Sequence, residues 1–325
     1  MAELLSGNAF ITTQENFTPK IVVLGTGGGG CNVISKMVQL NVQFVDFVAC
    51  NTDLKALAAT RAPHKIELGR NLTRGLGAGA DPEVGEKAAE ESNYEIEKNI
   101  EDAHMLFIAA GMGGGTGTGT APVVAKLAKE RGILTVGVVT TPFLFEGKKR
   151  MRIAMEGITR LREYTDTLLV IPNDKLLDAT TQTTSLMDAF HLVDEVLINA
   201  IQGITDLINN VGEINVDFAD VKTIMEGMGK AVIGKGVSSG DERMVKAAHN
   251  AIESPLMQNT DIRGAKGILV HVVGNENMGL LEINEAVGTI EDLADEDVNL
   301  IFGATTLESM KDDVAVTIIA TGIPG

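Results

Sequence analysis

The stretch Gly111-Met-Gly-Gly-Gly-Thr-Gly-Thr-Gly119 follows a short apolar run at Met105–Ala110 and precedes a helical pattern at Ala121–Arg131. The apolar run is nearly continuous, as in strands that are buried on both faces. Closely spaced glycines let backbone N–H groups approach an anion, and helix N-termini favour negative charge. The stretch therefore predicts a strand, a phosphate-binding turn and a helix.

The same order of strand, loop and helix recurs on both sides of this stretch. Apolar runs predict strands at Ile21–Leu24, Phe44–Cys50, Lys65–Leu68, Met105–Ala110, Ile133–Thr141 and Thr167–Ile171. Helical segments such as Pro82–Ile100 separate most of them. This alternation predicts an α/β fold with a doubly wound, mostly parallel sheet. Ligands bind at the carboxyl ends of such strands, so the six following loops should share one rim.

A long helix and a second unit follow. The helix is predicted by apolar residues three and four apart, at Leu186, Phe190, Val193, Leu197, Ala200, Ile204, Leu207 and Val211, and Gly212 should end it. Beyond it, the pattern predicts helices at Phe218–Met228, Glu242–Ile252 and Leu280–Leu293, and strands at Gly267–Val273, Val298–Phe302 and Val314–Ala320. We therefore expect a flexible tail (1–18), a nucleotide-binding domain (19–184), a connecting helix (185–212) and a smaller α/β domain (213–325).

Composition excludes several classes of protein. The 325 residues include 27 Lys and Arg against 44 Asp and Glu, a net charge of −17, which disfavours binding to nucleic acid or to an anionic membrane. No apolar run reaches the length of a membrane span. Two cysteines, Cys31 and Cys50, are too few for a disulfide framework. We expect a cytoplasmic protein with reduced thiols and no readable metal-ligand motif.

The first loop alone has several interpretations. Gly25, Gly27 and Gly30 satisfy G-x-G-x-x-G after a strand, and Asp46 and Asp53 stand near where a ribose-binding acid is expected. A nicotinamide dehydrogenase and a simple tight turn both remain open on that evidence. Two or three glycine-rich loops on one rim instead favour a compact polyphosphate. Gly-Lys-Ser/Thr is absent from the sequence, which excludes a P-loop enzyme.

Seven motifs in order resemble those of the FtsZ family, bacterial cell-division GTPases related to tubulin. They are GGGGCN, NTD, GLGAGADPEVG, GMGGGTGTG, PFLFEGKKR, IPNDKLL and NVDFADV. The resemblance spans residues 19–323, and the GGGTGTG loop is its most specific part. It implies a tubulin-like fold, GTP or GDP and Mg²⁺ as ligands, and head-to-tail self-association into filaments.

The resemblance also implies roles for matching positions. The phosphates would contact Gly28, Gly29, Gly30, Cys31, Gly115, Thr116 and Gly117, and the terminal phosphate would be sensed by Ala78, Gly79 and Ala80. The base would contact Asn32, Phe190 and Asp194. The ribose side would contact Glu146 and Arg150, and Asn51 and Asn173 complete the expected nucleotide site. Asn215, Asp217 and Asp220 would enter the site of the next subunit and orient the attacking water.

Most of these positions have a plainer interpretation. Asp217 and Asp220 before an apolar run resemble an N-cap and capping box, and Glu146 with Arg150 resembles a surface ion pair. Phe190 could be core, and Asp194 could lie on a solvated face.

Two alternative functions remain: a nucleotide-bound protein that no longer hydrolyses GTP, and a tubulin relative that acts outside cell division. Gly115→Val or Gly117→Val is expected to remove nucleotide affinity while leaving the fold largely intact.

Partners follow from the resemblance. The family implies division-ring proteins and membrane tethers at mid-cell, besides further copies of the chain. Its members usually continue into a polar linker and a terminal peptide that docks the tethers, whereas this sequence stops at Gly325. We expect the docking peptide to be missing, with neither nucleic-acid binding nor direct membrane insertion.

Overall fold

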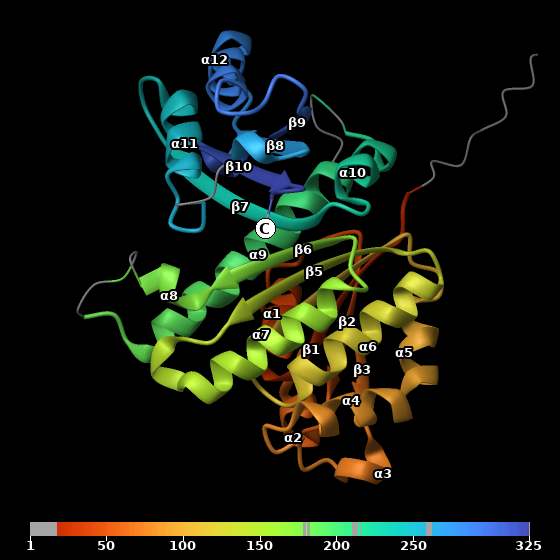
Figure 1. The fold of residues 1–325 in the computed structure, drawn as a ribbon. Helices are drawn as coiled ribbons and strands as arrows, with labels where there is room; N and C mark the ends of the chain where they lie inside the picture. Colours follow the sequence, from red (N-terminus) through yellow and green to blue (C-terminus); the bar gives the residue numbers. More distant parts are fainter. Residues whose placement is uncertain are drawn as a thin grey trace, which may run out of the picture.

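The computed structural model describes residues 18–177, 180, 183–209, 214, 216–257 and 262–324. Its strands form one mostly parallel ten-stranded sheet in the order β3-β2-β1-β4-β5-β6-β7-β10-β8-β9 (Figure 1). The predicted α/β fold is therefore confirmed. The expected tail lies almost entirely outside the described residues, as does Gly212.

The first half carries six parallel strands and their connecting helices. The strands are β1 (Ile21–Thr26), β2 (Val45–Asn51), β3 (His64–Glu67), β4 (Met105–Gly111), β5 (Leu134–Thr141) and β6 (Thr167–Pro172). The helices are α1 (Gly27–Gln39), α2 (Leu54–Ala59), α3 (Arg70–Thr73), α4 (Pro82–Glu91), α5 (Asn93–Ile100), α6 (Thr116–Glu130), the 3₁₀ turn η1 (Leu144–Glu146), α7 (Lys148–Arg162) and α8 (Asn173–Leu176).

Helices cover both faces of this parallel sheet. One core lies between the sheet and α4, α5, α6 and α7, and the other between the sheet and α1, α2 and α9 (Leu186–Asn209). Apart from the edge strand β3, the strands are consequently buried on both faces over most of their length, which explains their continuous apolar runs. None of the helices in the described ranges combines the length and hydrophobicity that spanning a bilayer demands.

The second half packs on the other part of α9. It contains α10 (Phe218–Met225), β7 (Gly229–Ser238), α11 (Arg243–Ile252), η3 (Ile262–Gly264), β8 (Gly267–Gly274), α12 (Leu280–Glu291), β9 (Asn299–Thr306), η4 (Glu308–Met310) and β10 (Val314–Thr321). Residues of α9 share one core with both halves of the sheet, and α11 and α12 cover the opposite face of the second half. The long helix thus forms a common support for both units.

Strand β7 was not predicted, although it joins the two halves of the sheet. It pairs in parallel with β6 over three residues and antiparallel with β10 over eight. A Cβ at Gly234 would overlap the carbonyl of Ala251, and one at Gly236 that of Ala247. These glycines let α11 pack directly on the strand backbone, and they hide the β pattern in the sequence.

One predicted helix is in fact two. The segment expected as a single helix at Pro82–Ile100 breaks at Ser92 into α4 and α5. The Ser92 hydroxyl accepts a hydrogen bond from the Gly69 N–H at 3.0 Å and donates to the Glu67 carbonyl at 3.5 Å. A short polar side chain that bonds neighbouring backbone in this way competes with helix continuation.

Asp206 gives the contact between α9 and the second half a pH dependence. Burial raises the pKa of Asp206 from 3.8 to about 6, against the opposing effect of Lys235 on β7. Because the native-state pKa is raised, the ionised carboxylate weakens the fold above about pH 6, and this cost disappears as the pH falls towards 4.

Asp206→Asn should therefore raise the free energy of unfolding by about 1–3 kcal/mol at pH 8, and by roughly half as much at pH 5. Urea denaturation at both pH values measures this, with the exposed Asp241→Asn as control; equal gains at both would contradict the assignment.

Candidate functional site

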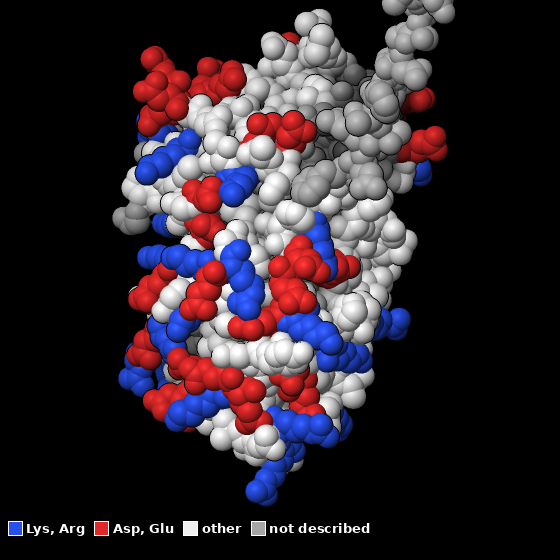
Figure 2. All heavy atoms as spheres, turned by 90° about the vertical axis from the view of Figure 1, so that its right-hand side faces the viewer, with Lys and Arg blue, Asp and Glu red and all other residues white. Residues whose placement is uncertain are grey.

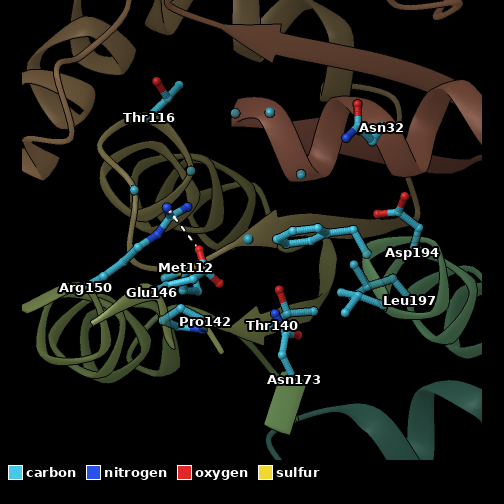
Figure 3. A pocket seen from close by; sticks show the side chains of 18 of the residues that line it. Asn32, Met112, Thr116, Thr140, Pro142, Glu146, Arg150, Asn173, Asp194 and Leu197 are labelled. Carbon is cyan, nitrogen blue, oxygen red and sulfur yellow. Dashed lines mark ion pairs between the residues drawn. The ribbon is translucent and has the colours of Figure 1, made fainter. Parts of the chain in front are cut away.

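A cavity of about 420 Å³ opens at the carboxyl edge of the parallel strands (Figure 3). Strands β1, β2, β4, β5 and β6 run in the same direction, so the loops that follow them meet at this edge. The cavity walls come from the starts of α1 and α6, the connection from β5 into α7, α8, and the first half of α9. Eleven predicted residues line it: Gly28, Gly29, Asn32, Gly115, Thr116, Gly117, Glu146, Arg150, Asn173, Phe190 and Asp194.

One end of the cavity suits an anion. Helices α1 and α6 both begin there, and neither has a side-chain N-cap hydrogen bond. Their first N–H groups thus lack the usual intrahelical or capping partner. A Cβ at Gly28 or Gly114 would meet no atom within 4 Å, so the space in front of both residues is open. Two converging helix N-termini with open space between them fit a polyphosphate.

The other end carries an aromatic ring and a buried carboxylate on α9. Phe190 is 37% exposed, and its ring lies edge-on to Phe143 with the centroids 5.5 Å apart. Asp194 is only 8% exposed, and its Oδ2 lies 3.0 Å from the Lys36 Nζ on α1. Burial raises the pKa of Asp194, while Lys36 counteracts the increase. The solvated-face interpretation of Asp194 is therefore wrong.

Asn173 presents an unpaired acceptor at the cavity. It begins α8, directly after β6, and is 4% exposed. Its Oδ1 has no hydrogen-bond partner within the described part of the chain. A buried amide oxygen without a partner costs about 1–3 kcal/mol, so a ligand donor bound here would recover that energy.

Glu146 and Arg150 form an ion pair at the cavity wall. Glu146 Oε2 lies 3.0 Å from Arg150 Nη1, and the Glu146 side chain is 12% exposed. The other carboxylate oxygen accepts a hydrogen bond from the Phe143 N–H at 2.9 Å. The pair is thus fixed beside the cavity, as Figure 3 shows, and differs from an ordinary pair on an exposed helix surface.

Comparison with known proteins shows the family of the chain that carries this site. The description "Tubulin/FtsZ family, GTPase domain" matches residues 20–181, and "FtsZ family, C-terminal domain" matches residues 229–324. The structure is similar to an FtsZ dimer from M. jannaschii, with a TM-score of 0.91 and 48% identity over 95% of this chain and 89% of that one. The chain belongs to the FtsZ family. It is accordingly a GTPase.

Two more distant structures share the fold alone. The GDP-bound monomer of CetZ1 from Haloferax volcanii has a TM-score of 0.82 and 23% identity, covering 94% of this chain and 95% of that one. CetZ2 from the same organism, a protofilament with GTPγS, has a TM-score of 0.80 and 22% identity, covering 94% and 93%.

The predicted acids of this FtsZ-family chain lie far from its own cavity. Asp217 and Asp220 are exposed at the start of α10. The neighbouring Phe218 ring lies edge-on to His104, which directly precedes β4, with the centroids 6.4 Å apart. The cavity lies at the other end of β4, about 20 Å away for a seven-residue strand. Asn215 lies outside the described residues.

The capping interpretation of these acids is correct for the position of Asp217 and wrong for its side chain. Asp217 does occupy the N-cap position of α10, with φ −72° and ψ 150°, but its side chain makes no capping hydrogen bond. The Asp220 N–H instead donates to the backbone carbonyl of Asp217 at 3.0 Å. The exposed Asp217 carboxylate therefore does not cap α10.

Six predicted residues do not line the cavity but support its walls or lie beside them. Gly30, Cys31 and Asn51 are buried behind the start of α1, where Asn51 Nδ2 lies 3.8 Å from Cys31 Sγ. Burial raises the pKa of Cys31 to about 11, which keeps the thiol protonated. The other three are consecutive residues of the loop before α4, at Ala78, Gly79 and Ala80.

That loop packs against the side of the cavity where α6 begins. Ala78 is buried, and a Cβ at Gly115 would lie 2.8 Å from the Ala78 Cβ. Gly79 and Ala80 are exposed, with φ values of 61° and 62°. A non-glycine residue rarely adopts such a φ, so the turn at Ala80 is strained.

Eight further residues line the cavity and were not named as candidate site residues, although five of them lie within the quoted motifs: Gly27, Gly111, Met112, Gly114 and Pro142 lie in those motifs, and Thr140, Val193 and Leu197 do not. Four of the eight carried a further signal. Val193 and Leu197 stand three and seven residues after Phe190, and so share its helix face. Thr140 and Pro142 flank the end of β5, on the predicted rim.

Proposed function

We propose that the chain binds GTP in this cavity, assembles head to tail into filaments, and hydrolyses GTP at the junctions between copies. The separation of the acids from the cavity carries the proposal. An active site that needs both parts cannot close within one copy when they lie at opposite ends of β4. A repeated head-to-tail contact brings the acids of one copy to the cavity of the next.

In this proposal GTP lies along the cavity from α9 to the two helix N-termini. The base packs on Phe190, and its edge meets Asn32 and Asp194, whose carboxylate accepts from ring and exocyclic N–H groups. Arg150 and Glu146 lie beside the ribose and the neighbouring phosphate. The phosphates accept hydrogen bonds from the backbone N–H groups of Gly28, Gly29, Gly115, Thr116 and Gly117. Gly30 and Cys31 support the first loop from behind. Asn51, Asn173 and Ala78–Ala80 complete the site.

Magnesium fits the same arrangement. No group of three or more His, Cys, Asp or Glu side chains suited to a metal ion occurs in the described ranges. Glu146 and Asp194, both at the cavity, are already paired with Arg150 and Lys36. Mg²⁺ commonly binds substrate phosphates and water with few protein ligands, so it would be held chiefly by GTP and would neutralise phosphate charge.

The catalytic contribution then comes from the neighbouring copy. Asp217 and Asp220, with Asn215, would orient the attacking water at the terminal phosphate, and the backbone donors would stabilise the developing charge. This coupling makes hydrolysis depend on assembly. The self-association that this coupling requires is supported by the relatives, whose structures include a dimer and a protofilament.

We extend the proposal to the cell-division ring at mid-cell of a bacterial or other prokaryotic cell, with division proteins and membrane tethers as partners. The FtsZ-family match supports this. Nucleic acid is not among the partners we propose. Carboxylates and cations alternate over the face drawn in Figure 2, with no continuous basic surface on it.

Assembly provides the direct test. With GTP and Mg²⁺ the chain should pellet as filaments above a threshold concentration, and much less with GDP. GTPase activity per subunit should fall at least about tenfold on dilution below that threshold, because free copies lack half of the site. Phosphate release across a dilution series measures this, with sedimentation in parallel. Constant specific activity down to high dilution would contradict the shared site.

A further inference from the structure

Thr52 lies directly behind the phosphate end of the cavity. It follows β2, and its side chain is completely buried. Its hydroxyl lies 2.6 Å from the hydroxyl of Thr116, the first residue of α6. Thr116 lines the cavity and is partly exposed. The buried Thr52 hydroxyl therefore contacts the Thr116 hydroxyl at the cavity wall, although the two residues are 64 positions apart in the sequence.

The direction of this hydrogen bond follows from burial. Either hydroxyl could donate from the distance alone. The Thr52 hydroxyl has no other hydrogen-bond partner within the described ranges, and a buried donor without an acceptor is costly. Thr116 can direct its proton into the open cavity. An arrangement in which Thr52 donates to Thr116 satisfies the buried hydroxyl and leaves the Thr116 proton free to point into the cavity.

We infer that Thr52 is a positioning residue that orients the Thr116 hydroxyl as a donor to a phosphate oxygen of GTP. The inference rests on the proposed placement of the phosphates beside Thr116. When Thr52 donates to Thr116, one lone pair of the Thr116 oxygen accepts this hydrogen bond on the side away from the cavity. Its own proton is then held towards the anion before the nucleotide arrives, which reduces the ordering that binding requires.

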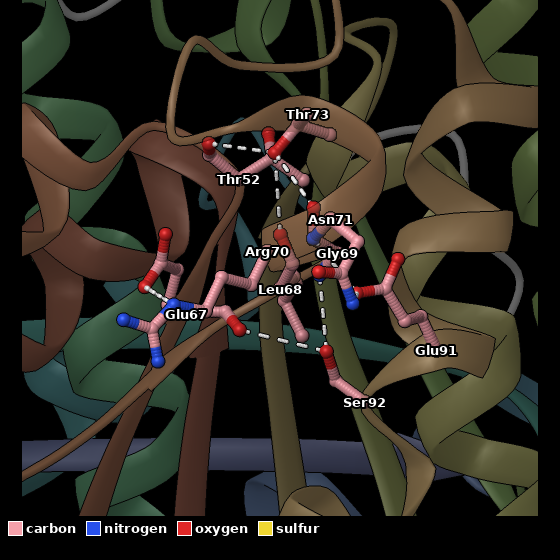
Figure 4. Close-up of polar contacts among 9 residues, drawn as sticks. All are labelled: Thr52, Glu67, Leu68, Gly69, Arg70, Asn71, Thr73, Glu91 and Ser92. Atoms are coloured by element: carbon pink, nitrogen blue, oxygen red, sulfur yellow. Dashed lines mark hydrogen bonds and ion pairs between the residues drawn. The ribbon is translucent and has the colours of Figure 1, made fainter.

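The backbone around Thr52 makes this orientation rigid. The Thr52 carbonyl accepts a hydrogen bond from the Gly77 N–H at 3.0 Å, and the Thr73 hydroxyl oxygen lies 3.4 Å from the same carbonyl oxygen. Thr73 is itself buried, and its Oγ1 lies 3.1 Å from the Gly69 carbonyl oxygen and 3.4 Å from that of Leu68, so the three carbonyls share its single proton, as Figure 4 shows. Thr52 is thus tied to the segment that leads into Ala78–Ala80.

The primary variants are Thr52→Val, which removes the hydroxyl at nearly constant shape, and Thr52→Ser, which keeps it. Thr120→Val is the matched control, since Thr120 is a fully buried threonine one turn further along α6 whose hydroxyl donates to the Gly85 carbonyl at 3.3 Å. We expect Thr52→Val to weaken GTP binding about 3- to 30-fold and to raise KM with kcat nearly unchanged. Thr52→Ser and Thr120→Val should stay within about twofold of the parent.

A double-mutant cycle separates positioning from simple support. If Thr52 acts through Thr116, adding Thr52→Val to Thr116→Val should cause little further loss of GTP affinity. Fully additive losses, or parent-like affinity in Thr52→Val, would overturn the inference. Unchanged affinity in Thr116→Val would instead contradict the proposed phosphate placement. Urea denaturation checks the fold of each variant, and Thr52→Ala replaces Thr52→Val in the cycle if the valine fails to fold.

Discussion

Gly114→Val is expected to reduce GTP and GDP affinity at least about 100-fold while leaving the fold intact, because its side chain would enter space that the phosphates need. Gly114 lines the cavity, and a Cβ there meets no protein atom within 4 Å. Each phosphate hydrogen bond that the branched side chain displaces is charge-assisted, so the loss should be large. Equilibrium nucleotide titration measures it, with urea denaturation to confirm the fold.

Gly288→Val is the matched control for this variant. Gly288 lies in α12, also with no atom within 4 Å of a Cβ, and far from the cavity in sequence and fold. It should bind nucleotide like the parent. Parent-like affinity in a folded Gly114→Val protein would show that the loop after β4 is only a turn.

The substitutions that the sequence favoured are poorer probes. A Cβ at Gly115 would lie 2.8 Å from the Asp81 nitrogen, and one at Gly117 would lie 2.8 Å from the Gly111 carbonyl oxygen. Valine at either position collides with the protein's own backbone, so the expectation of an intact fold is wrong. We expect Gly115→Val and Gly117→Val to lower the free energy of unfolding as well as nucleotide affinity, which confounds the two effects.

The parallel half of the fold was predictable because its strands are buried on both faces and leave uninterrupted apolar runs. Strand β7 was not, since Gly234 and Gly236 serve the packing of α11 and carry no β signal of their own. The break at Ser92 depends on hydrogen bonds to the distant Gly69 and Glu67, which helix periodicity does not report. The local sequence pattern therefore predicted most helices and strands, whereas the missed strand and the broken helix depend on contacts between residues distant in sequence.

The rim of the cavity was predictable for a related reason. Parallel strands place their following loops at one edge, so glycine-rich loops far apart in sequence could be assigned to one site. The burial of individual side chains was less predictable. Asp194 stands on a helix without a sharp boundary between its exposed and buried faces, and its pairing with Lys36 depends on how α1 packs against α9. The position of Asp217 at the opposite end of β4 also required the fold.

Asp217→Ala should keep GTP binding and lose about 10²- to 10⁴-fold in hydrolysis, the usual contribution of a group that orients or activates the attacking water. Its carboxylate makes no capping hydrogen bond, so the variant should cost less than about 1 kcal/mol of stability. Glu226→Ala, which removes another exposed acid at the far end of α10, is the control and should hydrolyse GTP like the parent. An active Asp217→Ala protein would remove the catalytic assignment.

Mixing two inactive variants tests whether neighbouring copies share the site. Asp217→Ala retains an intact cavity, and Gly114→Val retains intact acids. In a random equal mixture about a quarter of head-to-tail junctions would pair the two intact parts, so activity should recover towards that fraction of the parent. Phosphate release is measured for each variant and for the mixture, with light scattering to establish that the copies associate. Recovery requires that a copy without nucleotide still supplies its acids to the next copy. An assembled mixture that is no more active than its components would contradict the sharing of one site between neighbouring copies.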